Sequence, residues 1–418
     1  MPDILVRLPK PVDAAFGPDI ARRIFFVDSQ IVDFELIYDD AQIVAVRLDT
    51  EVLLNTDSMV PGQLTSMIVD DIVKQGLVRQ KVTWSTNGTG PIRDVFDDLI
   101  ERDQAVSLGR GQVAVGEPLL SLMDYIDGLL RELVRTRLGG VEYRYPTVIP
   151  TSTLQRCGYF ESFPQFLMFV TRLHSDVDTY HRFVRDYGAS GRALDPAVLG
   201  ACDDVELCLP PTMCFHTFSQ FAGAQLASGE NRVVTSRGKS FRFESRYATT
   251  LERLWDFTIR EIVFLGSREF VFASRQLVID AVRELVTTLG LAATCEVAND
   301  PFFTEDTATK IVSQRLLELK YELRLELSNG RSLAAGSFNF HDDFFSKRFD
   351  IRSGPDDLAR SGCVGIGLER FVYAFVCQHG IDPARWPLPV RDAFVAVPLP
   401  PILPRRPNRP TPTLKERP

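Results

Sequence analysis

The sequence has no apolar run long enough to cross a membrane, no secretory leader and no paired-cysteine motif. A membrane-spanning helix needs roughly 20 consecutive apolar residues, and residues 1–19 lack the charged start and apolar stretch of a signal peptide. Seven cysteines are present, an odd number, and none of them stand in a CxxC spacing. That pattern argues against a disulfide scaffold and favours reduced thiols, some of them available to a metal. We therefore expect a cytoplasmic protein that does not associate with membranes.

Positive charge is scarce at the start of the chain. Residues 1–112 contain 11 Lys or Arg against 18 Asp or Glu, and the whole chain of 418 residues has a net charge of −8. Proteins bind phosphate backbones by letting Lys and Arg displace counterions. The acidic start therefore argues against a nucleic-acid-binding arm in this part of the sequence.

The length and composition predict a large domain preceded by a smaller one. A hydrophobic content of 45% and a charged content of 24% are typical of a globular chain. We expect a small N-terminal α+β domain over residues 1–112 and a main domain over 113–395. Residues 396–418 are rich in proline and arginine, which predicts an extended tail.

Hydrophobic periodicity predicts the elements of both domains. Residues 31–38 and 42–49 are expected to be strands around a turn, followed by a helix over 63–78. Apolar residues recur at helical spacing from Glu117 to Leu138, where a Gly-Gly pair ends the pattern. The further elements expected are a strand over 141–150, an amphipathic segment over 164–187, helices near 274–290 and 365–379, and strands near 319–327 and 332–339.

Residues 241–244 (FRFE) and 254–265 are predicted to form the two arms of a hairpin. Arg242 and Glu244 would then share a face. An arginine suits an α-phosphate, and a carboxylate can accept a hydrogen bond from an adenine amino group. Phe257 on the return strand can stack on a base. A surface ion pair between Arg242 and Glu244 is the alternative interpretation.

Two further segments carry residues that need a chemical explanation. Glu261 shares a strand face with apolar residues such as Ile259 and Val263, which is costly unless the acid is paired or bound to a metal. A buried Arg–Glu pair is the alternative. Residues 365–370 (GIGLER) begin a helix, where the glycines let the backbone approach a phosphate that Arg370 can reach.

Residues 141–150, FRFE and GIGLER, in this order, resemble the three signature motifs of class II aminoacyl-tRNA synthetases. Residues 251–266 (LERLWDFTIREIVFLG) resemble the seryl-tRNA synthetase branch found in methanogens. The resemblance covers residues 117–385. It implies an α+β fold with an antiparallel sheet of six or seven strands flanked by helices, and a homodimer formed through residues 117–150.

The resemblance to the methanogen branch implies a zinc ion held by Cys214, Glu261 and Cys363. Cys214 ends the sequence PTMC, at the point where ordinary seryl enzymes grip the amine of the substrate, and Cys363 comes just before GIGLER. Two thiolates and a carboxylate suit Zn²⁺ and leave a fourth position open for the amine of an amino acid. A packed core position is the alternative for any single cysteine.

Within this branch the chain resembles the amino acid:[carrier protein] ligases, because it lacks a long charged coiled-coil arm. That resemblance implies ATP-dependent activation of a small amino acid, glycine or alanine, as an adenylate, with AMP and pyrophosphate as products. The acceptor would be the phosphopantetheine thiol of a carrier protein rather than tRNA. Residues 164–192 stand where those ligases dock the carrier. The arginines expected to meet an acidic carrier are Arg172, Arg182, Arg185 and Arg192, and a solvated helix face is the alternative.

The resemblance also assigns roles around MgATP. Arg242 is expected on the α-phosphate, Arg370 at the γ-phosphate, and Glu244 at the adenine edge. Phe257 would stack on the ring and Arg253 would help to hold the adenylate. Asn339 is a further candidate for an ATP contact.

The chain departs from the family pattern in two places. The known carrier ligases are shorter and lack a counterpart of the acidic residues 1–112. The strand 332–339 lacks the glutamate that binds Mg²⁺–ATP in seryl enzymes, and Glu326 is the candidate substitute. Two other functions stay open: a zinc-dependent seryl-tRNA synthetase-like enzyme that charges tRNA, and a non-catalytic synthetase paralogue.

Overall fold

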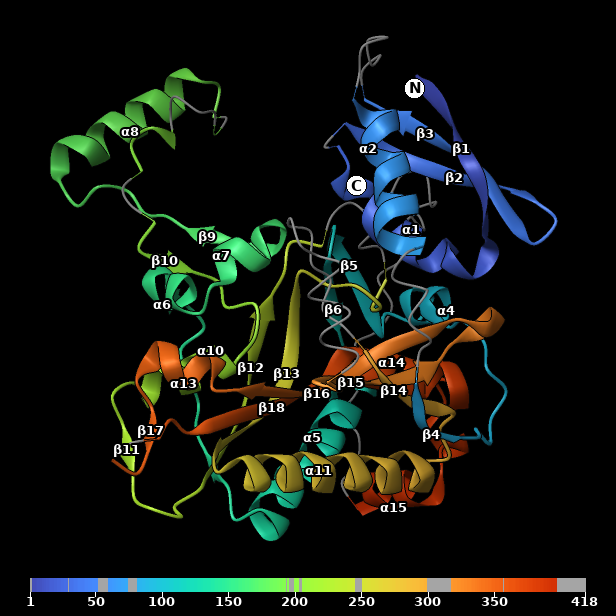
Figure 1. The fold of residues 1–418 in the computed structure, drawn as a ribbon. Coiled ribbons are helices and arrows are strands. Elements are labelled where there is room, and N and C mark those ends of the chain that lie inside the picture. The colour runs from blue at the N-terminus through green and yellow to red at the C-terminus, as the bar shows by residue number, and fades with distance from the viewer. Residues whose placement is uncertain are drawn as a thin grey trace.

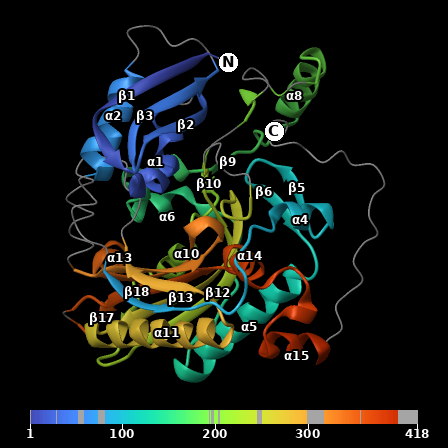
Figure 2. The same ribbon diagram turned by 90° about the vertical axis from the view of Figure 1, so that its right-hand side faces the viewer.

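The structure, a computed structural model, describes residues 2–28, 30–51, 59–73, 81–192, 194, 199–202, 205–244, 250–298, 317–355 and 357–396. A small N-terminal module and a helix that projects from the main domain lie on one side of a large sheet, and long helices lie on the other (Figures 1 and 2). In the part of the chain that is described, no helix is long and apolar enough to cross a membrane.

Within the described residues the main sheet has eight strands, one or two more than expected. Its order is β4 (Val82–Thr86), β14 (Ala293–Val297), β15 (Lys320–Glu326), β16 (Ser332–Asp342), β18 (Arg360–Gly367), β13 (Asp256–Gly266), β12 (Arg232–Phe241) and β7 (Val141–Glu142). Every neighbouring pair is antiparallel except β12 with β7. The predicted α+β fold with an antiparallel sheet is therefore confirmed.

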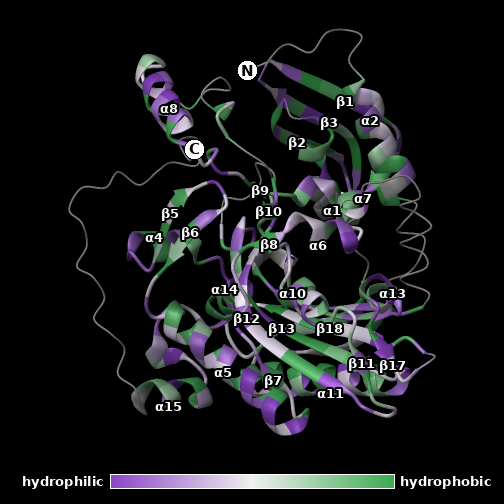
Figure 3. Ribbon diagram, turned by 90° about the vertical axis from the view of Figure 1, so that its left-hand side faces the viewer, coloured by the Kyte–Doolittle hydropathy of each residue, from purple (hydrophilic) through white to green (hydrophobic). Residues whose placement is uncertain are grey.

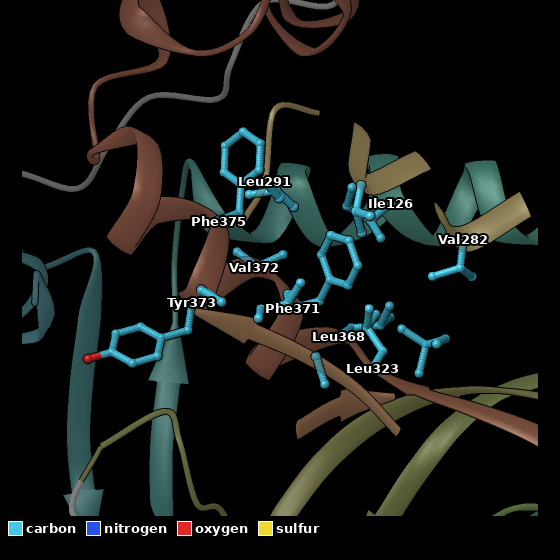
Figure 4. Packing of buried hydrophobic residues seen from close by; sticks show 14 of the residues in the cluster. Ile126, Val282, Leu291, Leu323, Leu368, Phe371, Val372, Tyr373 and Phe375 are labelled. Atoms are coloured by element: carbon cyan, nitrogen blue, oxygen red, sulfur yellow. The ribbon is translucent and has the colours of Figure 1, made fainter. Parts of the chain in front are cut away.

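The longer helices that contribute to the main core are α5 (Leu119–Arg137), α11 (Arg268–Thr288), α14 (Leu368–His379) and α15 (Leu388–Ala396). Buried residues of α5, α11 and α14 meet those of the central strands in the main hydrophobic core. Figure 4 shows Phe371 and Phe375 of α14 packed among Ile126 of α5, Val282 of α11 and Leu323 of β15. The helix expected from Glu117 to Leu138 is confirmed as α5, and its apolar stripe faces this core.

The opposite face of the sheet carries the candidate site. Helices α10 (Cys214–Gln220) and α13 (Phe344–Phe349) pack on β13 and β18, and their buried residues form a second core. Beyond them, β8 (Ile149–Pro150), β10 (Leu207–Cys208) and β9 (Phe169–Val170) pair in that order. The helix α8 (Val177–Ala189) projects from this small sheet. The remaining short elements here are α6 (Thr151–Arg156), α7 (Tyr159–Ser162), β11 (Gln225–Leu226) and β17 (Arg352–Ser353).

The strand predicted over residues 141–150 is shorter than expected. It forms only β7 and β8, two residues each, with an irregular segment between them. Pro146 lies in that segment and has no N–H to donate to a sheet, which interrupts a continuous strand.

The N-terminal module has its own sheet and its own core. Strands β1 (Asp3–Asp13), β3 (Gln42–Thr50) and β2 (Ile31–Asp39) pair in that order and pack on α1 (Gly17–Arg23) and α2 (Val60–Ser66). The two expected strands are β2 and β3. The expected helix over 63–78 begins earlier, as α2, and continues as a π-helix to Val73, while residues 74–78 lie outside the described residues.

Residues 82–99 lie before the expected domain boundary at residue 112 but pack with the main domain. Strand β4 pairs with β14 of the main sheet, and Trp84, Phe96 and Leu99 belong to the main core. The elements α4 (Phe96–Glu101), β5 (Ala105–Gly109) and β6 (Gln112–Val115) follow β4. We therefore propose that the N-terminal module ends near residue 80 and that the main domain begins with β4. The expected tail over 396–418 lies, beyond its first residue, outside the described residues.

Candidate active site and metal centre

Cys214, Glu261 and Cys363 come together on the face of the sheet under α10. Cys214 is the first residue of α10, Glu261 lies on β13 and Cys363 lies on the adjacent strand β18. Their residues are 4%, 1% and 5% exposed. One potential ligand atom from each lies within 4.8 Å of the other two. The fold thus unites the three residues that the sequence predicted as a metal site, although 149 positions separate the first from the last.

The strand register explains how this cluster forms. Glu261 pairs with Gly365, and Val263, two residues on, pairs with Cys363, so Glu261 and Cys363 are diagonal neighbours on one face. A Cβ atom at Gly365 would lie 3.5 Å from Glu261 Oε2 and 2.8 Å from the Ile259 side chain. Gly365 therefore leaves the space into which the Glu261 carboxylate extends.

The donor set fits a divalent metal. Burial raises the pKa of Glu261 to about 7, although hydrogen bonds with Cys363 and Thr212 act against the shift. A hydrogen bond with Cys214 and burial hold the pKa of Cys363 well above its ordinary value. In the described part of the chain no arginine forms an ion pair with Glu261, so the alternative of a buried Arg–Glu pair is not realised. A cation among these groups would favour their ionised forms, as Zn²⁺ does at Cys and carboxylate sites.

Polar side chains surround the three candidate ligands. The Thr212 hydroxyl donates to Glu261 Oε2 at 2.9 Å and lies 3.7 Å from Cys214 Sγ. Asn339 Nδ2 lies 3.5 Å from Cys363 Sγ. Asn339, expected to contact ATP, pairs with Cys363 in the sheet and so lies beside the three candidate ligands. Thr212 was not predicted, although it stands two residues before a predicted ligand.

Five residues expected around ATP form a second group, here called the nucleotide group, beside the Cys/Glu/Cys centre. They are Arg242, Glu244, Arg253, Phe257 and Arg370. Arg253 donates to Glu244 at 2.6 Å, and the Arg370 guanidinium lies 4.0 Å from the same carboxylate. The Arg242 guanidinium lies 5.6 Å from the centre of the Phe257 ring. Burial raises the pKa of Glu244, but the charges of the three arginines outweigh it and hold that pKa below its ordinary value. Five of the six predicted nucleotide contacts, all except Asn339, therefore lie together.

The two groups share a loop. Arg242 Nε donates to the carbonyl of Pro211 at 3.1 Å, and the next residue of that loop, Thr212, donates to Glu261. A nucleotide phosphate on Arg242 and an amino acid at the Cys/Glu/Cys centre would thus be neighbours. This adjacency is the geometry that activation of a carboxylate by ATP requires.

The FRFE segment differs from the predicted strand. Strand β12 ends at Phe241, and residues 242–244 continue as irregular chain. Their backbone N–H groups donate to carbonyls of other segments. Arg242 N–H donates to the Trp255 carbonyl at 3.0 Å, and Phe243 N–H donates to the Phe166 carbonyl at 3.2 Å. Trp255 in turn occupies space that a side chain at Gly111 would fill, since a Cβ there would lie 2.4 Å from the indole. Residues 245–249 lie outside the described residues.

The candidate magnesium ligand Glu326 lies away from this group. Gln378, near the end of α14, donates to the Glu326 carbonyl at 3.0 Å, whereas Arg370 lies eight residues earlier on the helix, about 12 Å along its axis. Glu322, on the same strand, lies close enough to Arg370 for its charge to act on that guanidinium. Burial lowers the pKa of Arg370 to about 10, and the charges of Glu244 and Glu322 act against that shift.

A charged cavity lies on the segment expected to form a dimer. Its volume is about 410 Å³, and its lining includes Arg131, Glu142 and Arg144. At its base the buried Arg260 donates two hydrogen bonds of 2.7 Å to Asp127 and one of 2.8 Å to Glu142. The apolar residues exposed on the same segment are Leu120, Leu129, Val141 and Tyr143.

Helix α8 carries basic and apolar side chains into solvent. Figure 3 shows hydrophilic and hydrophobic residues alternating along it. Arg182 and Arg185 are exposed on the helix, and Arg192 is exposed just beyond it. The exposed apolar residues on α8 are Val177, Tyr180 and Val184. Arg172 lies before the helix, 3.6 Å from Glu206.

No family model matches the chain, but curated relatives and solved structures do. Amino acid--[acyl-carrier-protein] ligase 2 of Bradyrhizobium diazoefficiens is 34% identical over 277 residues, which cover 64% of this chain and 79% of the relative. A Type-2 serine--tRNA ligase of Methanothermobacter thermautotrophicus is 25% identical over 429 residues, covering 92% of this chain and 82% of the relative.

The comparison with solved structures shows the fold that this chain shares with known proteins. The crystal structure of M. kandleri SerRS in complex with A. aeolicus tRNASec superimposes with a TM-score of 0.68 at 22% identity, covering 97% of this chain and 79% of that chain. The matches that reach into the N-terminal module are thus to serine--tRNA ligases. The expectation that tRNA is not a partner gains no support from them.

Proposed function

The chain belongs to the amino acid--[acyl-carrier-protein] ligase family, and from that premise we propose that it activates a small amino acid with ATP and transfers it to a carrier protein. It is an ATP-dependent amino acid ligase with the fold of the class II synthetases. The observation that carries the proposal is the shared loop that joins the nucleotide group to the Cys/Glu/Cys centre.

The nucleotide group binds MgATP through preorganised charges. Arg242 takes the α-phosphate, Arg370 the γ-phosphate, and Arg253 holds the adenylate. Glu244 fixes the guanidinium groups of Arg253 and Arg370 before ATP arrives and accepts a hydrogen bond from the adenine amino group, while Phe257 stacks on the ring. Charges placed in advance stabilise the charge that develops on the phosphate during transfer.

The second group binds the amino acid. Cys214, Glu261 and Cys363 would hold Zn²⁺, which supplies an open coordination position for the neutral amine of the substrate. Thr212 orients Glu261, and Asn339 orients Cys363. Gly365 leaves the space that the Glu261 carboxylate occupies, since a Cβ there would lie 3.5 Å from Glu261 Oε2. Glycine or alanine is the proposed substrate, as the resemblance to the carrier-protein ligases implies.

The chemistry requires positioning rather than a side-chain nucleophile. A carboxylate oxygen of the amino acid attacks the α-phosphorus, a new P–O bond forms, and the bond to pyrophosphate breaks. The carrier thiol, losing its proton to solvent, then attacks the carbonyl carbon of the aminoacyl-adenylate and AMP leaves. Holding both reactants in one site supplies much of the rate.

Glu322 takes the place of Glu326 as the proposed magnesium ligand. It lies on the site face of β15, since its neighbours Leu323 and Leu325 face the main core. It contacts Lys320 at 3.2 Å and Arg324 at 3.5 Å. Carboxylate oxygens together with substrate phosphates are the usual ligands of Mg²⁺.

The carrier protein docks on α8, and the chain forms a homodimer through residues 117–150. Exposed arginines beside an apolar stripe suit an acidic helix that itself has an apolar stripe. The dimer surface would cover the charged cavity around Arg260 and the apolar side chains exposed beside it.

Charging of tRNA is the second candidate function. The observation that favours it is the match to a serine--tRNA ligase over 92% of the chain, which must include part of the N-terminal module. The acidic balance of residues 1–112 argues against it. A non-catalytic role is disfavoured because five of the six nucleotide-binding candidates lie together.

One experiment separates these functions. Pyrophosphate exchange with MgATP is measured for every amino acid, and the best substrate is then offered to a phosphopantetheinylated carrier protein and, separately, to tRNA. We expect exchange with glycine or alanine and a carrier that gains one aminoacyl mass. Charged tRNA with an unmodified carrier would replace the proposal by the second candidate. No exchange with any amino acid would exclude both.

A further inference from the structure

A β-bulge in β16 lies beside the candidate metal centre. Asn339 pairs with Cys363, Phe340 with Gly362, and Asp342 with Ser361, so His341 is an extra residue between two paired positions of these strands. Asp342, the next residue, has a φ of 53°, a left-handed conformation that costs energy in a residue other than glycine. Bulges next to active sites re-aim side chains, and this one brings an imidazole toward the metal centre.

The imidazole of His341 is held between two residues of β18. Its Nε2 lies 3.6 Å from Cys363 Sγ, and its Nδ1 lies 3.4 Å from the Ser361 hydroxyl. Phe218 and Phe345 meet the ring edge-on, at interplanar angles of 79° and 90°. These contacts fix both the plane of the ring and the nitrogen that points to the sulfur.

We propose that His341 is a positioning residue for the candidate metal centre, whose Nε2–H donates to the sulfur of Cys363 while Nδ1 accepts a hydrogen bond from Ser361. The inference rests on the proposed function, because it takes Cys214, Glu261 and Cys363 as metal ligands. The donated hydrogen bond orients the thiolate and draws electron density from it. The metal then binds a substrate amine more strongly in its open position.

His341 acts on a ligand and is not itself a ligand. The atoms that lie within 4.8 Å of one another belong to Cys214, Glu261 and Cys363, and His341 does not join that group. Both of its ring nitrogens already have partners on β18. A metal with three protein ligands keeps the fourth position that a substrate needs.

Cobalt substitution tests this inference without relying on activity. Co²⁺ bound by cysteine gives a sulfur-to-metal charge-transfer absorption that responds to hydrogen bonds at the sulfur. We expect His341→Ala to shift that absorption and to weaken metal affinity by about 10- to 100-fold. His341→Gln, whose amide can still donate, should recover most of the affinity. His379→Ala is the matched control, since His379 contacts the Leu289 carbonyl at the far end of α14.

The outcomes are separable from those of the proposed function. Wild-type protein that binds no Co²⁺ or Zn²⁺ would overturn the metal centre and this inference with it. A metal-loaded His341→Ala protein with the wild-type spectrum and affinity would overturn the inference alone. Loss of one nitrogen scatterer in X-ray absorption of that variant would also overturn it, because His341 would then be a ligand. Far-UV circular dichroism of each metal-free variant shows that the fold is kept.

Discussion

Glu261 shows how one buried residue organises the site. An acid that is 1% exposed among apolar neighbours is unfavourable by itself, and burial raises its pKa to about 7. Two cysteines and a threonine converge on it from other elements. A bound metal would explain why such an arrangement is stable, since a cation would compensate the charges that burial opposes.

Replacing Cys214 should remove the metal and the activity together. Cys214→Ala takes away one of three proposed ligands, so we expect zinc to fall from about one per chain to nearly none. Amino-acid-dependent pyrophosphate exchange should fall by at least about 100-fold. Cys208→Ala is the matched control, because Cys208 is a buried cysteine of the same core that contacts Thr151 instead. Metal analysis and exchange assays measure both effects.

Arg242→Ala provides the complementary result. It removes a proposed phosphate contact but no metal ligand, so exchange should be lost while zinc stays bound. Undiminished exchange in Cys214→Ala, or in protein stripped of metal, would contradict the role given to the metal centre.

Replacing Glu322 should change the magnesium requirement. Glu322→Gln keeps the size of the side chain and removes its charge, so we expect a several-fold rise in the Mg²⁺ concentration for half-maximal exchange. Glu326→Gln is the matched control, as Glu326 lies on the same strand near the other end of α14. An unchanged Mg²⁺ dependence in Glu322→Gln, or a larger change in the control, would remove Glu322 from the site.

At this scale the sequence predicted the residues that stand in motifs and missed the others. Cys214, Glu261 and Cys363 could be predicted because each interrupts a segment with a familiar pattern. His341 could not, because its position depends on an extra residue in a bulge that no local pattern indicates. The neighbours of Asn339 and Glu326 could not be predicted, because they depend on strand register, which the sequence does not give.

Among the elements, α8 is the one that stands out from the body of the protein. It begins at Val177, and the preceding Asp176 caps it, because its side chain accepts a hydrogen bond from Thr179 N–H at 2.7 Å. Its residues Val177, Tyr180 and Val184 are 63%, 44% and 67% exposed. An apolar stripe left in solvent beside arginines is typical of a surface for a charged protein partner.

Reversing the charge on α8 should weaken binding of the carrier protein without affecting activation of the amino acid. We expect Arg182→Glu combined with Arg185→Glu to raise the KM for the carrier by about tenfold or more, because rim charges govern encounter with an oppositely charged partner. Pyrophosphate exchange should stay unchanged. Arg283→Glu is the matched control on α11, on the other side of the sheet. Equal loading by the double variant and the wild type would place the docking surface elsewhere.

Helix periodicity predicted long helices better than strand boundaries. Helix α5 lies within one or two residues of its expected ends, because its apolar stripe and the following Gly-Gly pair define it locally. The strand over 141–150 failed because Pro146 interrupts it, and FRFE lies beyond the end of β12 because its backbone bonds go to Trp255 and Phe166. Tertiary contacts decided these cases.

For the whole molecule, the N-terminal module and the main domain meet at aromatic residues. Phe26 of the module lies edge-on to Phe166, with ring centres 6.3 Å apart, and Phe166 belongs to the core that contains Cys214 and Cys363. The carbonyl of Phe166 also accepts from Phe243 in the FRFE segment. The module thus rests on the segment that supports the nucleotide group.

The pairing of β4 with the main sheet could not be predicted from the sequence. Strand β4 follows the N-terminal module closely in the chain, yet its partner β14 lies about 200 residues away. Pairing over such a separation leaves no local pattern. The sequence shows the net charge of residues 1–112, but net charge indicates possible partners and not where one domain ends.

The proposed dimer predicts the mass of the particle in solution. Light scattering at micromolar concentration should give the mass of two chains. Leu129→Glu places a charge on the exposed apolar side of α5 and should yield single chains. Leu388→Glu, at a residue exposed on α15, is the control and should leave the dimer intact. Wild-type protein with the mass of one chain would contradict the dimer.

Anomalous diffraction at the zinc edge, from crystals grown with a non-reactive ATP analogue and the preferred amino acid, tests the central claim most directly. We predict a single strong peak between Cys214 Sγ, Glu261 and Cys363 Sγ, with the amine of the amino acid as the fourth ligand and its carboxylate directed toward Arg242. Density without an anomalous peak at these three side chains, or an amino acid bound elsewhere, would contradict the account.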